Sequence, residues 1–267
     1  MFTVLELEPR VPTFREKVLH RKPPQPQLTR VAVKSGAPFF ILHVAAPPDA
    51  IPWDTVFYTA GRCAARLLTA PDIVLPKSDR VRRFVPQFLP LRTALQTLSY
   101  ILRLAKLPPK RLCIGVHDPN GALCGSAEIL LRYAADVRIV TEKPDDYAAY
   151  SRSLLEQYGA GFTVDTLVSL FRGCNVLLCP DAQILPDDSA VRFSCTPAAG
   201  AFLLRGVPLP EPYAALLPDG IDPDLFAAAL YELCGVHVLG TLCADCFAPD
   251  GTTLTPEDAA KRLTPHL

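Results

Sequence analysis

The feature that most constrains the fold is a regular alternation of short apolar strands and helical segments between residues 110 and 183. The strand segments are continuous apolar runs, such as "LCIGV" and "NVLLC", rather than alternating ones. Continuous runs are typical of strands that are buried on both faces, as in a parallel sheet covered by its crossover helices. The expected strands are residues 112–116, 137–141, 162–164 and 176–179, and the expected helices are residues 121–134, 145–158 and 166–171.

The segments before this region predict a second, smaller domain, which ends at Pro108-Pro109. They comprise a strand at 3–8, a hairpin from 29–34 and 38–45, and helices at 53–68 and 91–107. We therefore expect an N-terminal α+β domain over residues 1–108 and an α/β domain over residues 109–267, with the 186–267 region packing back on the N-terminal domain as an alternative. The pattern after residue 186 predicts strands at 191–195 and 236–240 and helices at 223–234 and 256–263.

Composition narrows the class of protein. The 27 Lys and Arg residues balance the 27 Asp and Glu residues, so no basic surplus indicates a nucleic-acid partner. The start, "MFTVLELEPR", does not read as a signal peptide, and no apolar run reaches the roughly 18 residues of a membrane span. We expect a cytoplasmic protein with no membrane partner, whose nine cysteines are small buried apolar residues.

Candidate functional residues follow the ends of the expected strands. In open α/β sheets, ligands bind beyond the carboxyl ends of the strands. The residues predicted to line a cofactor or ligand site on this ground are Gly115, His117, Asp118, Asn120, Gly121, Thr141, Glu142, Lys143, Pro180 and Asp181.

The order of these elements, with the stretch "LLEQYGAGFTVDTLVSLFRGCNVLLCPDA", resembles the NAD(P)-binding half of Rossmann-type two-domain dehydrogenases. The resemblance covers residues 110–183. It implies a Rossmann-like parallel-sheet domain beside the smaller N-terminal domain, and NAD or NADP as cofactor; the alternative is no cofactor. It also implies that the loop from Gly115 to Gly121 faces a pyrophosphate.

The loop departs from the dinucleotide fingerprint in two positions. His117 stands where the second glycine lets the pyrophosphate approach the backbone, and Pro119 removes one backbone donor. Against this, Asn120-Gly121 would lie at a helix N-terminus, which favours an anion. The alternative is a tight turn that holds no ligand.

The end of the strand at 137–141 does not distinguish NAD from NADP. Glu142 would suit a ribose diol, whereas Thr141 and Lys143 would suit a 2′-phosphate. The alternative is that Glu142 and Lys143 are solvated charges before a helix.

Other chemistry is less well supported by the pattern. Cys234, His237, Cys243 and Cys246 form two pairs with zinc-like internal spacing, but the gap between the pairs is short and packing explains them, so we expect no metal. No catalytic pair stands out. We therefore expect a Rossmann-like protein that binds a small ligand, a nucleotide, with a homodimer as the candidate assembly. The alternative is a two-domain NAD(P)-dependent oxidoreductase with an atypical phosphate loop.

Overall fold

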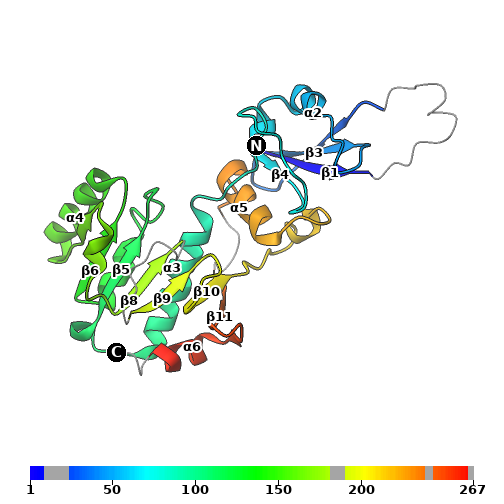
Figure 1. Cartoon of the computed structure of the whole chain (residues 1–267). Helices are drawn as coiled ribbons and strands as arrows, with labels where there is room; N and C mark the ends of the chain where they lie inside the picture. The colour runs from blue at the N-terminus through cyan, green and yellow to red at the C-terminus, as the bar shows by residue number, and fades with distance from the viewer. Residues whose placement is uncertain (9–23, 181–189, 238–242, 264–267) are drawn as a thin grey trace. The chain divides into compact units, whose positions relative to one another are not determined.

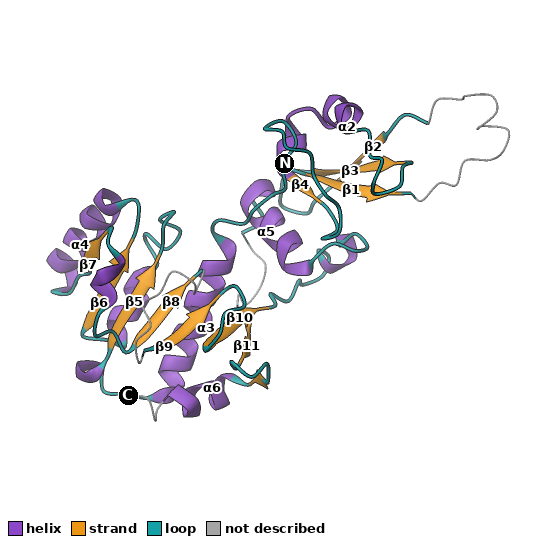
Figure 2. Cartoon of the chain, in the orientation of Figure 1, coloured by secondary structure: helices purple, strands orange, loops and turns teal. Residues whose placement is uncertain are grey.

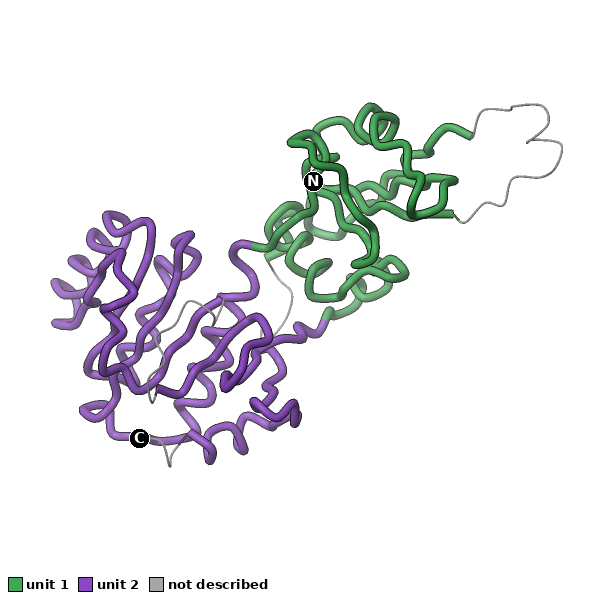
Figure 3. Tube along the Cα trace, viewed as in Figure 1, with its two compact units in different colours: residues 1–86, 209–240 green, residues 87–208, 241–267 purple. Residues whose placement is uncertain are grey.

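The computed structural model of the chain describes residues 1–8, 24–180, 190–237 and 243–263. The chain forms two compact units (Figure 3). Unit 1 comprises residues 1–86 and 209–240, and unit 2 comprises residues 87–208 and 241–267. Each unit has its own apolar core. Within the described ranges, no helix has both the length and the apolar character needed to cross a membrane.

Unit 2 contains an eight-stranded sheet with the strand order β12-β11-β10-β9-β8-β5-β6-β7 (Figure 1). The six strands from β5 to β10 are parallel, and β11 and β12 extend the sheet in antiparallel fashion. The strands are β5 (Cys113–His117), β6 (Asp136–Val140), β7 (Thr163–Asp165), β8 (Val176–Cys179), β9 (Val191–Ser194), β10 (Ala201–Arg205), β11 (Asp245–Phe247) and β12 (Thr253–Leu254).

The parallel strands identify the topology. Numbered one to six in chain order, they run 3-2-1-4-5-6 across the sheet, which is the order of the doubly wound dinucleotide-binding fold. The topology is Rossmann-like. The predicted α/β fold class, with a smaller mixed sheet elsewhere in the chain, is confirmed.

The helices of unit 2 are α3 (Leu89–Ala105), α4 (Pro144–Tyr158) and α6 (Pro256–Leu263) (Figure 2). The apolar face of α3 is buried, and the helix packs against β8, β9, β10 and α6. Gly159 ends α4 in the left-handed conformation with φ 69°.

The helix predicted at residues 121–134 is wrong. Turns follow Gly121, and a 3-10 helix, η3 (Ala127–Arg132), replaces the expected α-helix. Gly121 and Gly125 have φ of 71° and 87°, and left-handed residues interrupt an α-helix. The helix expected at 166–171 is likewise a short 3-10 turn, η4 (Val168–Phe171). A 3-10 helix, η2 (Pro109–Arg111), precedes β5.

Unit 1 contains a four-stranded sheet in the order β2-β3-β1-β4. The predicted hairpin is confirmed, because β2 and β3 are antiparallel, whereas β1 is parallel to β3 and β4. The helix predicted at 53–68 is shorter, because Gly61, with φ 56°, ends α2 and a 3-10 helix, η1, follows. The bounds are β1 (Thr3–Leu7), β2 (Gln27–Val31), β3 (Phe39–Val44), α2 (Trp53–Ala60), η1 (Gly61–Arg66) and β4 (Leu67–Leu68).

A late segment of the chain completes unit 1. Helix α5 (Pro223–Cys234) begins after its N-cap Asp222, whose carboxylate accepts hydrogen bonds from two backbone N–H groups. The ring of Phe226 meets Phe39 edge-on at 5.5 Å, and Phe39 stacks on Phe2 at 4.9 Å. All three rings are fully buried. This aromatic cluster explains why residues 209–240, which also include η6 (Ala214–Leu216), belong to unit 1.

The contact-based division differs from the domain boundary expected at residue 108. Along the chain, unit 1 ends at residue 86 and unit 2 begins at residue 87. The boundary lies before α3 because the apolar face of α3 belongs to the core of unit 2. Of the region after residue 186, only residues 209–240 belong to unit 1. In the strand predicted at 236–240, residues 236 and 237 have no strand structure and the others lie outside the described residues.

Gly115, at the centre of β5, has no room for a side chain. A Cβ atom on Gly115 would lie 2.6 Å from Leu177 Cδ2 and 2.6 Å from Phe171 Cδ1. Both neighbours are fully buried, so neither can move aside into solvent. The glycine therefore lets η4 and β8 pack directly on the middle of β5.

We expect Gly115→Ala to lower the free energy of unfolding by about 1–3 kcal/mol, because the added methyl overpacks the core. Urea unfolding of the full chain measures this loss. In a Leu177→Ala background the same substitution should cost less, because one of the two clashing side chains is removed. An equal cost in both backgrounds would contradict this account of Gly115.

Candidate functional site

The candidate site is the carboxyl edge of the parallel sheet in unit 2. The strand order reverses between β5 and β8, and in folds of this type the ligand crevice lies outside that point. Strand β5 ends there at His117, which is half-buried, and β8 ends at Cys179. The residues that follow β5, β6 and β9, and Pro180 after β8, therefore lie at this edge.

Asp118 organises the loop after β5. Its side chain is fully buried, and its backbone N–H donates to Val140 O at 2.9 Å. The backbone N–H groups of Ala122 and Leu123 donate to the two carboxylate oxygens, each at 2.8 Å. The Tyr147 hydroxyl on α4 donates to Oδ2 at 2.6 Å. Three donors thus compensate the buried carboxylate.

Tyr147 is suited to the role of donor. Burial, and then the neighbouring carboxylate of Asp118, hold the pKa of Tyr147 well above its ordinary value. The hydroxyl therefore keeps its proton over the physiological pH range. The hydrogen bond joins the loop after β5 to α4, which starts after β6.

The same contacts occupy the backbone donors that a phosphate would need. Ala122 and Leu123 donate to Asp118, and Gly121 N–H donates to Asp118 O at 3.2 Å, which closes a turn. Pro119 has no N–H to offer. A ligand anion would have to displace a carboxylate of the chain itself from these amides.

The end of β6 presents two charged side chains. Thr141 is buried, and its hydroxyl accepts a hydrogen bond from Lys143 N–H at 3.1 Å. Glu142 N–H donates to Pro119 O at 3.3 Å, which ties this loop to the loop after β5. The Glu142 and Lys143 side chains are exposed. The Lys143 stem lies over Gly121, with Cδ 3.3 Å from the position that a Cβ would take.

The structure brings together most of the predicted residues but not all of them. His117, Asp118, Asn120, Gly121, Thr141, Glu142 and Lys143 lie at the carboxyl ends of β5 and β6, whereas Gly115 lies inside β5. Pro180 follows β8, and Asp181 lies outside the described residues. These residues stay predictions as ligand contacts.

Two polar residues were missed, Ser194 at the end of β9 and Thr196 just after it. The Thr196 hydroxyl donates to Pro180 O at 3.1 Å, and the buried Ser194 hydroxyl lies 3.5 Å from the same oxygen. The signal was available, because "FSCT" places polar residues directly after an apolar strand. They hold the carbonyl of Pro180, the residue directly after β8.

The four residues with zinc-like spacing fall in different units. Cys234 and His237 belong to unit 1, and Cys243 and Cys246 belong to unit 2. His237 packs edge-on against the Tyr231 ring at 5.0 Å, and Cys246 is buried in β11. Among the residues that the structure describes, no group of three His, Cys, Asp or Glu side chains is arranged to hold a metal ion.

Comparison with known proteins adds little to this picture. No family model and no curated protein matches the chain. Among solved structures, the L-tryptophan dehydrogenase from Nostoc punctiforme is similar over 99% of this chain and 86% of its own, with 14% identity and a TM-score of 0.32. The ligand-free 5-ketofructose reductase of Gluconobacter sp. strain CHM43 is similar over 86% and 88%, with 10% identity and a TM-score of 0.31. The topology rests on strand order and not on these similarities.

We expect Tyr147→Phe to lower the free energy of unfolding by about 1.5–3 kcal/mol, because a buried carboxylate loses one of its donors. Tyr158→Phe is the matched control on the same helix, since Tyr158 is 74% exposed, and it should change stability by no more than about 0.5 kcal/mol. Urea unfolding compares the two variants. Equal stabilities would contradict the role assigned to the hydrogen bond between Tyr147 and Asp118.

Proposed function

We propose that the protein binds a nucleotide at the carboxyl edge of β5 and β6 in unit 2. The observation that carries the proposal is the position of Glu142 and Lys143, which are exposed at the end of β6 beside the turn at Gly121. In Rossmann-type sheets an acidic residue about 20 positions beyond the glycine loop binds the ribose hydroxyls. Glu142 has this place in the chain and on the sheet.

The chemistry of the edge favours a ligand with few phosphates. A ribose diol can donate two hydrogen bonds to the Glu142 carboxylate, and the Lys143 ammonium can pair with one phosphate group. The loop amides of Ala122 and Leu123 are bound to Asp118, so they do not contribute. A pyrophosphate placed on the loop would also face the negative charge of Asp118. We therefore propose a mononucleotide as the ligand class, with AMP as the probe.

A second candidate function is that of a two-domain NAD(P)-dependent oxidoreductase. The complete 3-2-1-4-5-6 order of the parallel strands favours it, because this order is typical of dinucleotide-binding sheets. It requires the pyrophosphate to lie away from the loop amides, or Asp118 to release them. The two candidates therefore differ in which ligand binds more tightly.

The test is a thermal shift series on the full chain with AMP, ADP, NAD, NADH, NADP and NADPH, followed by calorimetric titration of those that act. A ligand at 100 times its Kd should stabilise the protein by about 2.7 kcal/mol. We expect AMP to bind at least as tightly as any dinucleotide. If a dinucleotide binds about tenfold more tightly than AMP, the oxidoreductase candidate replaces the proposal. No shift with any of the six would contradict both.

The predicted contacts have their own test. Glu142→Gln and Lys143→Met should each weaken AMP binding about tenfold, because a hydrogen bond to a charged group contributes about 1.5–3 kcal/mol. Glu156→Gln and Arg152→Met are matched controls, because both residues are exposed and charged and lie on α4, away from the end of β6. Calorimetric titration measures the four affinities. Unchanged binding in the first pair would place the ligand elsewhere.

A further inference from the structure

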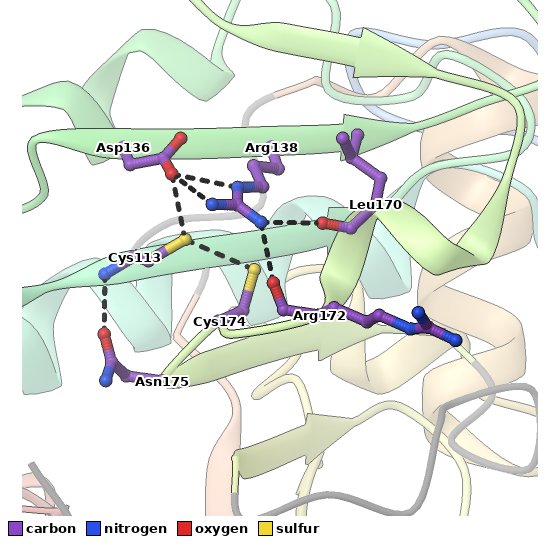
Figure 4. Close-up of polar contacts among 7 residues, drawn as sticks. All are labelled: Cys113, Asp136, Arg138, Leu170, Arg172, Cys174 and Asn175. Carbon is purple, nitrogen blue, oxygen red and sulfur yellow. Dashed lines mark hydrogen bonds and ion pairs between the residues drawn. The ribbon is translucent and has the colours of Figure 1, made fainter.

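Two cysteines lie together at the opposite, amino edge of the sheet in unit 2. Cys113 opens β5, and Cys174 lies in the turn before β8, 61 residues later in the chain. Their sulfur atoms are 3.4 Å apart (Figure 4). Cys113 is half-buried, whereas Cys174 is 5% exposed. Both are thiols in the structure.

The backbone around the pair is held in place from both strands. Cys113 N–H donates to Asn175 Oδ1 at 2.8 Å, and Asn175 N–H donates to Cys113 O at 2.9 Å. Cys174 N–H donates to Phe171 O at 3.0 Å. The proximity of the two sulfurs therefore follows from ordered backbone on each side.

A polar network surrounds the pair. The Cys113 thiol donates to Asp136 Oδ2 at 3.3 Å, and Arg138 binds that oxygen through Nε at 2.9 Å and Nη2 at 2.7 Å. Nη1 of Arg138 also donates to Leu170 O and Arg172 O, as Figure 4 shows. The guanidinium thereby fixes the segment that leads into Cys174.

The spacing suits a covalent link. Ile114 pairs with Val176, so Cys113 is level with Asn175 and one residue away from Cys174. Neighbouring strands lie about 4.8 Å apart, and disulfides join Cα atoms about 4.4–6.8 Å apart. The sulfurs would need to close from 3.4 Å to about 2.05 Å, which a small rotation of the two side chains can supply.

We propose that Cys113 and Cys174 form a reversible disulfide on exposure to a hydroperoxide. Cys113, the more accessible thiol, attacks the peroxide O–O bond, giving a sulfenic acid and one water or alcohol. The Cys174 sulfur then attacks the Cys113 sulfur and displaces the hydroxyl as a second water, while its own proton is lost. The two sulfurs give up two electrons, which reduce the peroxide.

The surroundings set the rate of this reaction. Burial, and then the contacts with Cys174 and Asp136, raise the pKa of the Cys113 thiol. The thiolate is the reactive form, so oxidation should be slow at neutral pH and faster as the pH rises. The pair is therefore suited to prolonged oxidation rather than to rapid peroxide sensing.

The test is peptide mapping of the full chain after peroxide treatment at pH about 8.5 and alkylation under denaturing conditions. Trypsin should place Cys113 in the peptide 112–132 and Cys174 in the peptide 173–192. We expect the two peptides to be joined, with the loss of two hydrogen atoms, and separated again by a dithiol reductant. Oxidation should also shift urea unfolding to higher concentration, because the link shortens the unfolded chain.

Each peptide holds a second cysteine, Cys124 or Cys179, so variants identify the bond. The double variant Cys124→Ser/Cys179→Ala should still give the joined peptides, whereas Cys113→Ser should not. Circular dichroism checks that the Cys113→Ser variant is folded. In the wild-type protein, fragmentation of the joined peptides in the mass spectrometer identifies the bonded cysteines without any variant. Peptides that stay separate, or a bond through Cys124 or Cys179, would overturn the proposal.

Discussion

The buried carboxylate of Asp118 is the interaction on which the carboxyl edge of unit 2 depends. It receives two backbone amides from its own loop and one hydroxyl from α4, so it fixes the loop and anchors the next helix at once. An unpaired charge at this depth would be strongly unfavourable, so the three donors and the fold around them are coupled. The same interaction occupies the loop amides, because the chain itself supplies the anion that a bound phosphate would otherwise provide.

The glycines of this region serve packing and turn geometry. Gly115 allows Phe171 and Leu177 to approach the centre of β5, and Gly121 adopts a left-handed conformation at the end of a turn. Both roles would retain glycine whether or not a nucleotide binds. The partial likeness of the loop to a dinucleotide fingerprint therefore has a structural cause, and Glu142 and Lys143 are the side chains at this edge that favour a ligand.

Local patterns predicted the regular elements well, and long-range contacts account for what they missed. The continuous apolar runs "LCIGV" and "NVLLC" predicted β5 and β8, and the helical spacing of apolar residues predicted α3, because burial on one face of a helix leaves a clear period. The helix predicted at 121–134 was wrong because Gly121 and Gly125 adopt left-handed conformations, which interrupt an α-helix. The strand β10 was not predicted. The place of α5 in unit 1 was predicted only within the alternative that residues 186–267 pack back on the N-terminal domain, since packing of Phe226 on Phe39 joins residues far apart in sequence.

The two edges of the sheet carry separate chemistry on a shared strand. Cys113 begins β5 and Asp118 follows its last residue, so the two positions are five residues apart in an extended segment, about 16 Å at 3.3 Å per residue. Sites at that separation without shared partners contribute additively to stability. A nucleotide at the carboxyl edge and a disulfide at the amino edge would therefore each stabilise unit 2 by its own amount. The oxidation state of the cysteines would then change how often the unit opens, and leave the affinity of the folded edge for its ligand unaltered.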